Sequence, residues 1–224
     1  MTSRRAIIFG LILTPAALRL RGASAQTVEL ARIKNISVQQ DADGRVFWSS
    51  GAAVDADGSN GQNGNRFAYR VDDEGLDALA NAGWPNHGWR NVLIDNGHGV
   101  PTGDGQGNWY SQTTYVWKSR PLSTRYVDAT ATPYIVVNPI VRRNAVGIVI
   151  GCRARVTYAG NSIDAVVADV SGAGDIGELS IKAAQILRIP DSPRNGGVAR
   201  GVTFEMWPGR SASVQGEDYE LQST

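Results

Sequence analysis

The chain has 224 residues, with 22 Lys and Arg against 21 Asp and Glu for a formal net charge of +1, and it contains 26 Gly and 9 Pro. This length fits one or two domains and is sufficient to bury a core. Six Trp and seven Tyr argue against a disordered chain, and the restriction of long apolar runs to the N-terminus excludes a polytopic membrane protein.

Residues 1–25 have the pattern of a secretory signal peptide. The positive start Met1–Arg5 is followed by an apolar run to about Leu18, and Ala23–Ala25 offers a small-residue cleavage site that would leave Gln26 as the mature N-terminus. An uncleaved anchor is the alternative, although the run is short for a bilayer, and the paired arginines would also suit twin-arginine export. We therefore expect a secreted or periplasmic protein.

Removal of this leader changes the charge balance. The leader takes four arginines with it, which leaves 18 basic against 21 acidic residues and a formal net charge of −3. A nucleic-acid-binding protein normally shows a basic stripe, and none is visible, so we do not expect nucleic acid as a partner. Mild acidity is compatible with a cationic ligand.

Short runs rich in β-branched and aromatic residues predict a mainly β protein. Cys152, the single cysteine, lies in one such run, so we expect a buried thiol rather than a disulfide or a nucleophile. Trp48 and Trp207 also lie inside strand-like runs and are expected to pack in the core. The predicted strands are Gly44–Ser49, Tyr134–Val137, Gly147–Val156, Ile163–Ala168 and Val202–Trp207.

Two helices and two loops interrupt the predicted strands. The apolar spacing predicts helices over Gly75–Ala82 and Leu179–Leu187, the second capped by Ser180 and stopped by Pro190. The Gly- and Asn-rich stretches 55–65 and 96–107 are typical of surface loops. No linker divides the chain, so residues 26–224 are expected to form a single domain.

The segment Ala165–Leu187 is the most informative for function. A strand delivers Asp169 at its end, glycines turn the chain, and Glu178 appears just before a helix. Such an arrangement can hold two carboxylates across a cleft, which is what glycoside hydrolysis requires. The structural alternative is that Asp169 closes a turn and that Glu178 interacts with the helix dipole. Residue types alone leave both interpretations open.

The same segment resembles the family 75 glycoside hydrolases, the chitosanases, in which Val-x-Asp-Val-Gly-Pro leads through a turn to Gly-Glu-x-Ser and an Ala-rich helix. Other motifs agree in the same order, so the likeness covers about residues 45 to 209. These further motifs are Ala53–Gly58, Gly75–Gly83, Trp109–Thr114, Tyr126–Asp128 and Pro133–Val137.

The resemblance implies a double-psi β-barrel-like single domain with inserted helices and glycine-rich loops. It also implies an inverting endo-hydrolase of β-1,4-linked glucosamine polymer, with Asp169 and Glu178 as the catalytic carboxylates. The order of acid and base stays open, with Glu178 the first choice as acid. Under this hypothesis the substrate-binding residues are Asp55, Asp57, Trp109, Tyr110, Gln112 and Thr113.

We expect neither a cofactor nor a metal. Hydrolysis needs no cofactor, and the sequence carries no nucleotide-binding fingerprint. A calcium loop around Asp55 and Asp57 is the alternative, but the remaining acidic positions of an EF-hand are missing. The expected partner is a cationic polysaccharide, with no membrane association after cleavage of the leader, and we expect a monomer.

The chain also departs from the family pattern. Val170-Ser-Gly172 stands where the family has Gly-Pro, Gly151-Cys152 replaces a Gly-Asp, and Asp175 adds a carboxylate that we interpret as a turn residue. Two alternatives to a chitosanase therefore stay open: a non-catalytic polysaccharide or cell-wall binding protein on the same barrel, and a peptidoglycan-cleaving enzyme.

Overall fold

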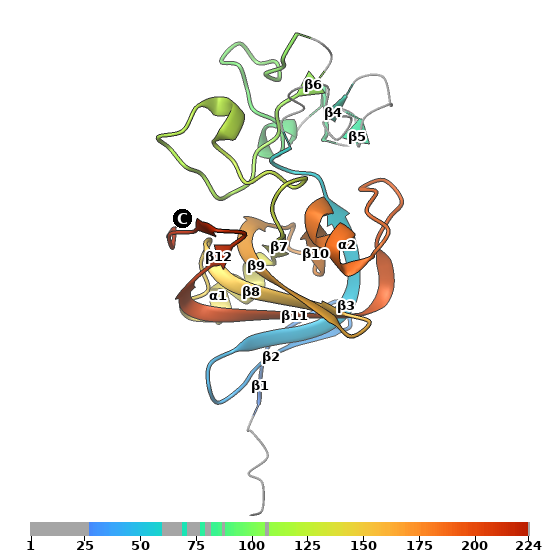
Figure 1. The fold of residues 1–224 in the computed structure, drawn as a ribbon, viewed down its shortest axis with the longest axis vertical. Coiled ribbons are helices and arrows are strands. Elements are labelled where there is room, and N and C mark those ends of the chain that lie inside the picture. Colours follow the sequence, from blue (N-terminus) through green and yellow to red (C-terminus); the bar gives the residue numbers. More distant parts are fainter. Residues whose placement is uncertain are drawn as a thin grey trace, which may run out of the picture.

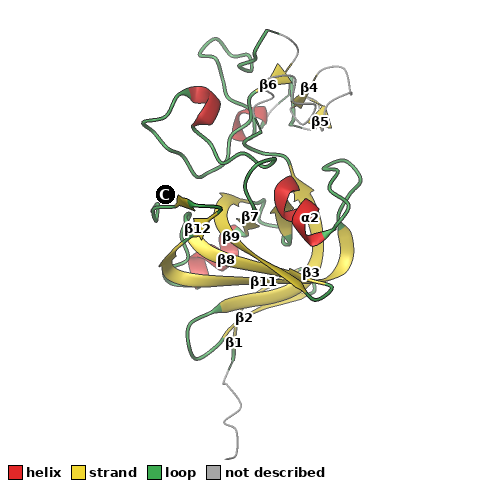
Figure 2. Ribbon diagram, viewed as in Figure 1, coloured by secondary structure: helices red, strands yellow, loops and turns green. Residues whose placement is uncertain are grey.

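The computed structural model describes residues 27–59, 69–70, 77–78, 82–86, 88–105 and 108–223 (Figures 1 and 2). The predicted leader, residues 1–25, lies outside the described residues. Within them, no helix combines the length and the apolar character needed to cross a membrane.

The strands are β1 (Val28–Ile33), β2 (Ile36–Gln40), β3 (Val46–Asp55), β4 (Tyr69–Arg70), β5 (Asp77–Ala78), β6 (Asn108–Trp109), β7 (Tyr134–Val137), β8 (Cys152–Tyr158), β9 (Asn161–Val170), β10 (Glu178–Ser180), β11 (Val198–Ser211), β12 (Ser213–Val214) and β13 (Glu217–Asp218). The helices are α1 (Pro139–Asn144) and α2 (Ile181–Leu187), with 3₁₀ turns η2 (Trp89–Asn91) and η3 (Leu122–Thr124).

Six strands close into a β-barrel, so the prediction of a mainly β protein is confirmed. Their order is β3-β10-β7-β9-β8-β11, and pairing of β11 with β3 completes the ring. The 14-residue β11 makes the closure possible because Phe204 lies opposite Trp48 on one side and Val156 on the other. The hairpin of β1 and β2 extends the sheet from β3 below the barrel (Figure 1).

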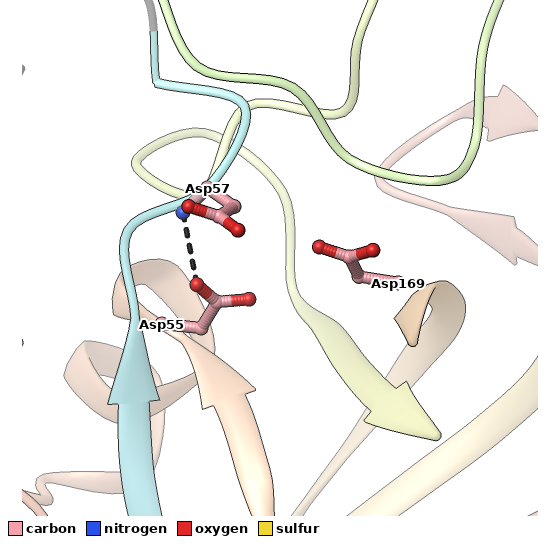
Figure 3. A group of neighbouring side chains, drawn as sticks. All are labelled: Asp55, Asp57 and Asp169. Atoms are coloured by element: carbon pink, nitrogen blue, oxygen red, sulfur yellow. Dashed lines mark hydrogen bonds between the residues drawn. The ribbon is translucent and has the colours of Figure 1, made fainter. Parts of the chain in front are cut away.

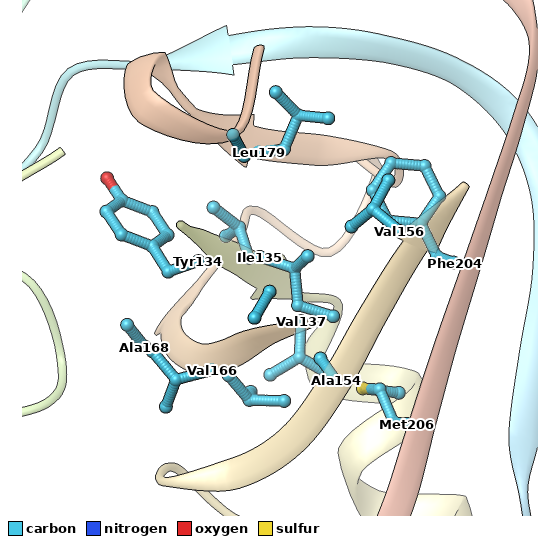
Figure 4. Packing of buried hydrophobic residues seen from close by; sticks show 14 of the residues in the cluster. Tyr134, Ile135, Val137, Ala154, Val156, Val166, Ala168, Leu179, Phe204 and Met206 are labelled. Atoms are coloured by element: carbon cyan, nitrogen blue, oxygen red, sulfur yellow. The ribbon is translucent and has the colours of Figure 1, made fainter. Parts of the chain in front are cut away.

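Small and β-branched side chains fill the barrel (Figure 4). All four residues of β7 are buried, and Trp48 stacks on Phe204 with ring centroids 5.0 Å apart. Cys152 is buried as predicted, and burial raises the pKa of its thiol. Trp207 does not share this environment: it is half-buried, beneath the guanidinium groups of Arg153 and Arg155. The core position that we predicted for Trp207 is therefore wrong.

The second predicted helix is shorter than its pattern. Residues 178–180 pair with β3 and β7 as a strand, so α2 begins only at Ile181. Ser180 caps it as predicted, since its Oγ accepts a hydrogen bond from the amide of Ala183 at 3.1 Å. The helix ends at Leu187, where Arg188 adopts a left-handed conformation before Pro190 is reached.

The first predicted helix, Gly75–Ala82, is wrong at the positions that can be assessed. Asp77 and Ala78 form β5, which pairs in parallel with β4, and Ala82 lies in a turn. The other positions lie outside the described residues. An isolated helix of eight residues is marginal in water, so local pairing can override its apolar spacing.

A segment with little regular structure, residues 82–86, 88–105 and 108–128, covers one side of the barrel. Isolated bridges hold it, among them Leu93 with Ser111 and Val116 with Tyr126. Figure 1 shows that β3 runs upward into this region, which stands above the strands β7 and β10. We call it the covering segment. Stretch 96–105 lies within it and is a loop, as predicted, while residues 60–65 of the other loop are outside the described part.

Candidate active site

Three carboxyl groups face the covering segment from neighbouring barrel strands. Asp55 ends β3 after the buried Val54, and Glu178 begins β10 before the buried Leu179. Because side chains alternate along a strand, both carboxyls point to the face away from the core. They line a cleft of about 780 Å³ between barrel and covering segment. The cleft is lined by Asp55, Asp57, Arg90, Asn91, Val92, Gln112, Thr113, Thr114, Val116, Tyr126, Val136, Asp169, Val170, Ser171, Gly172, Asp175 and Glu178.

A register shift brings Asp169 into this cleft. Ile135 of β7 pairs with Val167 of β9, but the next residue, Val136, pairs with Asp169, so Ala168 is an extra residue on β9. Bulges of this kind change the direction of a side chain and are common beside active sites. Without the extra residue, Ala168 would lie opposite Val136, and Asp169 would be one position further along.

Asp169 and Glu178 lie at the same level of the barrel wall. Both pair with Val136, Glu178 from β10 on one side and Asp169 from β9 on the other. With neighbouring strands about 4.8 Å apart, their backbones are separated by about 9–10 Å. Inverting glycosidases hold their carboxyl groups roughly 6.5–9.5 Å apart, so two side chains leaning toward each other from this separation can reach that range.

The two carboxyls have different surroundings. Asp169 is 8% exposed, and its Oδ1 accepts hydrogen bonds from the Thr114 amide at 3.0 Å, the Thr114 hydroxyl at 2.6 Å and the Val170 amide at 2.8 Å. Burial raises the pKa of Asp169, whereas these three donors oppose that rise because they stabilise the ionised form. The hydrogen bonds therefore favour Asp169 as the ionised member.

Glu178 has no such donors. It is half-buried, and within the described part of the chain no group donates a hydrogen bond to its carboxyl. Burial, followed by the negative charges of Asp175 and Asp169, raises its pKa from 4.5 to about 7. Glu178 therefore keeps its proton in mildly acidic solution, which is the property of a general acid.

Asp55 lies beside Asp169 in the cleft wall (Figure 3). Its Oδ1 accepts a hydrogen bond from the Asp57 amide, and its Oδ2 accepts one from the hydroxyl of the buried Tyr134, both at 3.0 Å. Burial, Asp169 and Glu178 raise the pKa of Asp55 well above its usual range. Retention of a proton by Asp55 relieves the repulsion within the group, so neighbouring Asp169 can stay ionised.

Carboxylate oxygens of Asp55, Asp57 and Asp169 all lie within 4.8 Å of one another. This spacing would suit a shared cation as well as a shared proton. Close acidic groups are common without a metal, and the neighbours of Asp55 explain its position without one. The cluster alone does not identify a metal centre.

The covering segment supplies the opposite wall of the cleft. Gln112 is held there because its side-chain amide donates to the Arg90 carbonyl at 2.7 Å, and Arg90 in turn pairs with Asp95 at 2.6 Å. Thr113 is 4% exposed, and its hydroxyl bonds the backbone of Tyr115 and Val127, which fixes the loop. Arg90 is the one basic residue among the described residues that line the cleft.

The structure brings together six of the eight predicted site residues, namely Asp55, Asp57, Gln112, Thr113, Asp169 and Glu178. Trp109 and Tyr110 lie outside the cleft. Trp109 belongs to β6, with its ring against Gly103, and the backbone of Tyr110 is hydrogen-bonded to Ile94 and Thr102.

Sequence reasoning missed the roles of Thr114, Tyr134 and Asp175. Thr114 ends the motif that starts at Trp109, and Tyr134 begins a predicted strand, so both lie in segments that had attracted attention for other reasons. Asp175 is a turn residue, as predicted, because its amide donates a hydrogen bond to the Gly172 carbonyl, yet it also lines the cleft. Thr114 and Tyr134 are revealed by hydrogen bonds to residues distant in the sequence, and Asp175 by its place in the lining of the cleft.

The chain matches no protein-family model and no curated protein. The functional argument therefore depends on the geometry of the cleft and on its charges.

Proposed function

We propose that the protein is a secreted endo-acting glycoside hydrolase that cleaves β-1,4-linked glucosamine polymer by an inverting two-carboxylate mechanism. One observation carries the proposal: Asp169 and Glu178 flank Val136 at one level of an open cleft, the first held by three donors and the second with its pKa raised to about 7. Unequal protonation of two facing carboxyls is what acid–base cleavage of a glycosidic bond requires.

In this mechanism Glu178 transfers its proton to the glycosidic oxygen as the bond to the anomeric carbon breaks. Asp169, ionised, accepts a proton from a water molecule that attacks the anomeric carbon from the opposite face of the ring. The hydrogen bonds from Thr114 and Val170 fix the orientation of Asp169 during this step. The product has inverted anomeric configuration, and after exchange of protons with solvent both groups return to their starting states.

The charge of the cleft supports an amino sugar as substrate. Five acidic residues and one basic residue line it within the described part of the chain, and Arg90 already pairs with Asp95. A buried carboxyl such as Asp55, whose pKa is raised by burial and by like charges, becomes easier to ionise when an ammonium group approaches. A glucosamine polymer presents such a group on every sugar.

The proposal also includes a double-psi connectivity of the barrel and export of the protein. The parallel pairs β3–β10 and β7–β9 within the six-strand barrel support a double-psi connectivity. The pattern of residues 1–25 supports export, which fits an enzyme that acts on an extracellular polymer.

The test is incubation of the purified protein with soluble glucosamine polymer, with measurement of viscosity and new reducing ends. We expect a fast fall in viscosity, and a loss of about 10³-fold or more in rate for Asp169→Asn and for Glu178→Gln. Asp43→Asn, in the exposed turn between β2 and β3, removes the same charge outside the cleft and is the matched control. Proton NMR of the first products should show the α-anomer.

Retained cleavage in both cleft variants, or β-anomeric first products, would contradict the proposed roles. Binding of the polymer without any cleavage would indicate a polysaccharide-binding protein. Cleavage of peptidoglycan in place of the glucosamine polymer would support the remaining alternative.

A further inference from the structure

A second cavity adjoins the cleft, on the other side of Tyr126. It has a volume of about 320 Å³ and lies between the segment that carries η3 and the hairpin of β12 and β13. Figure 1 shows the η3 turn above β12, close to the C-terminus. Tyr126 lines both cavities and is held in place by its bridge to Val116. The two cavities therefore meet at the half-buried Tyr126.

The carboxyl group of Asp128 lies in the wall of this cavity. Its Oδ1 accepts hydrogen bonds from the amide and hydroxyl of Thr130, at 2.7 and 2.8 Å. No lysine or arginine in the described ranges lies within 4.0 Å of this carboxylate, and burial raises its pKa. A partly desolvated carboxylate in this state gains from an incoming cation.

The basic group of the same cavity is already occupied. The Arg120 guanidinium forms an ion pair with Glu217 and lies over the Trp117 ring, 3.8 Å from its centroid. Arg120 therefore shields Glu217 and leaves Asp128 as the charge that a ligand would meet. An anionic ligand would have to compete with Glu217 for Arg120.

Hydroxyl, amide and aromatic groups complete the lining. Thr124 and Thr132 offer hydroxyls, and Gln215 faces them from the β12–β13 turn with a φ of 54°, in the left-handed region. This conformation belongs to the two-residue hairpin turn, since Gly216 also has a positive φ, and the turn places Gln215 at the wall of the cavity. Aromatic rings beside convergent polar groups are the usual composition of a sugar-binding surface.

We propose that this cavity is a second binding site for the polymer, in which Asp128 binds the ammonium group of a glucosamine unit that lies beyond the cleft. The inference rests on the proposed function, because it assumes that the polymer occupies the cleft. It adds that affinity depends on chain length: oligomers long enough to cross Tyr126 gain contacts that shorter ones cannot make.

The experiment uses Glu178→Gln protein, which should bind without turnover, and titration calorimetry with glucosamine oligomers of two, four, six and eight units. We expect binding affinity to rise with oligomer length. Asp128→Asn should lower the affinity for the longest oligomers by about three- to tenfold and so reduce this gain. Asn keeps an oxygen that can accept both bonds from Thr130, so the loop should fold. Gln215→Gly, which suits the left-handed backbone, should also reduce the gain.

Asp43→Asn in the same background is the control and should leave the whole length series unchanged. An equal loss at all lengths, or no loss, in Asp128→Asn would overturn the second site. Length-dependent binding that needs Asp128, in a parent protein that never cleaves polymer, would support the second site and overturn the hydrolase proposal. Absence of binding at every length would overturn both.

Discussion

The interior of the barrel and the cleft on its outer wall are made by the same strands but differ in what burial does to the fold. Inside, Val54 and Leu179 are buried among apolar neighbours, so their removal from water stabilises the protein. One residue away, Asp55 and Glu178 are taken out of water beside other carboxyls, and no cation in the described part of the chain pairs with them. Burial of the core therefore stabilises the fold, whereas burial of the cleft carboxyls destabilises it. Such a destabilised site within a stable fold is expected of an enzyme.

The largest effect should come from the core. Phe204→Ala removes a fully buried ring that stacks on Trp48, and we expect the free energy of unfolding to fall by about 3–5 kcal/mol. Urea-induced unfolding measures this change. Val146→Ala, at a position 90% exposed, should stay within about 0.5 kcal/mol of the parent. Equal losses of unfolding free energy in the two variants would contradict this distinction between core and surface.

Substitution of Glu178 in the cleft should have the opposite effect and raise the free energy of unfolding. The folded-state pKa of Glu178, about 7, exceeds its ordinary value of 4.5, so between these pH values the folded protein holds a proton that the unfolded chain has lost. The free energy of unfolding therefore falls as pH rises through this window. We expect Glu178→Gln to be more stable than the parent by about 1–3 kcal/mol at pH 8.5, after allowance for partial solvent screening.

At pH 4 the same two proteins should unfold at nearly the same urea concentration, because Glu178 is then mostly protonated in both states. Measurement at the two pH values separates this effect from a change in packing. A variant that is less stable than the parent at pH 8.5 would show that the charge of Glu178 is better compensated than its surroundings indicate.

Within the cleft, the donors to Asp169 can be tested separately. Thr114→Val removes the hydroxyl that bonds its Oδ1 at 2.6 Å, and we expect about a tenfold fall in kcat/KM. The pKa of Asp169 should rise, so the acidic limb of the pH–rate profile should move to higher pH. Thr157→Val, which loses a surface bond to Ser162, is the matched control. An unchanged acidic limb would argue against Asp169 as the base.

The smallest effect should be a shift in the alkaline limb of the pH–rate profile. Among the charges that raise the pKa of Glu178, that of Asp175 has the largest effect, and Lys34 pairs with Asp175 at 3.4 Å. Asp175→Asn should lower the pKa of Glu178 and move the alkaline limb to lower pH. Lys34→Gln should move that limb in the opposite direction, because Asp175 loses its cation. Shifts of the same sign in both variants would contradict this account.

Local pattern predicted those parts of the fold that depend on neighbouring residues. Tyr134–Val137 was predicted with the bounds observed for β7, since its four buried residues form a continuous apolar run. The cap at Ser180 was also readable, because it needs only a hydroxyl at the start of a helix. The hairpin of β1 and β2 was missed because a register shift between Glu29 and Ala31 interrupts the alternation of β1, and because the hairpin is positioned by pairing of β2 with β3.

The site was predictable in its residue types and not in its geometry. Asp169 and Glu178 stand out beside glycine turns, but the extra residue Ala168 that aligns Asp169 with Val136 leaves no mark in the sequence. The exclusion of Trp109 from the cleft follows from the contact of its ring with Gly103, which is equally invisible. The positions of Asp169 and Trp109 both depend on backbone pairing that the sequence does not reveal.

Closure of the barrel also has a kinetic consequence. Strand β10 has three residues, and an edge strand of that length would open and close freely. Here β3 and β7 bond it from both sides, so exposure of its amides to solvent requires separation of two neighbours at once. Slow hydrogen exchange should therefore extend through the backbone of Glu178, which gives its side chain a rigid point of attachment.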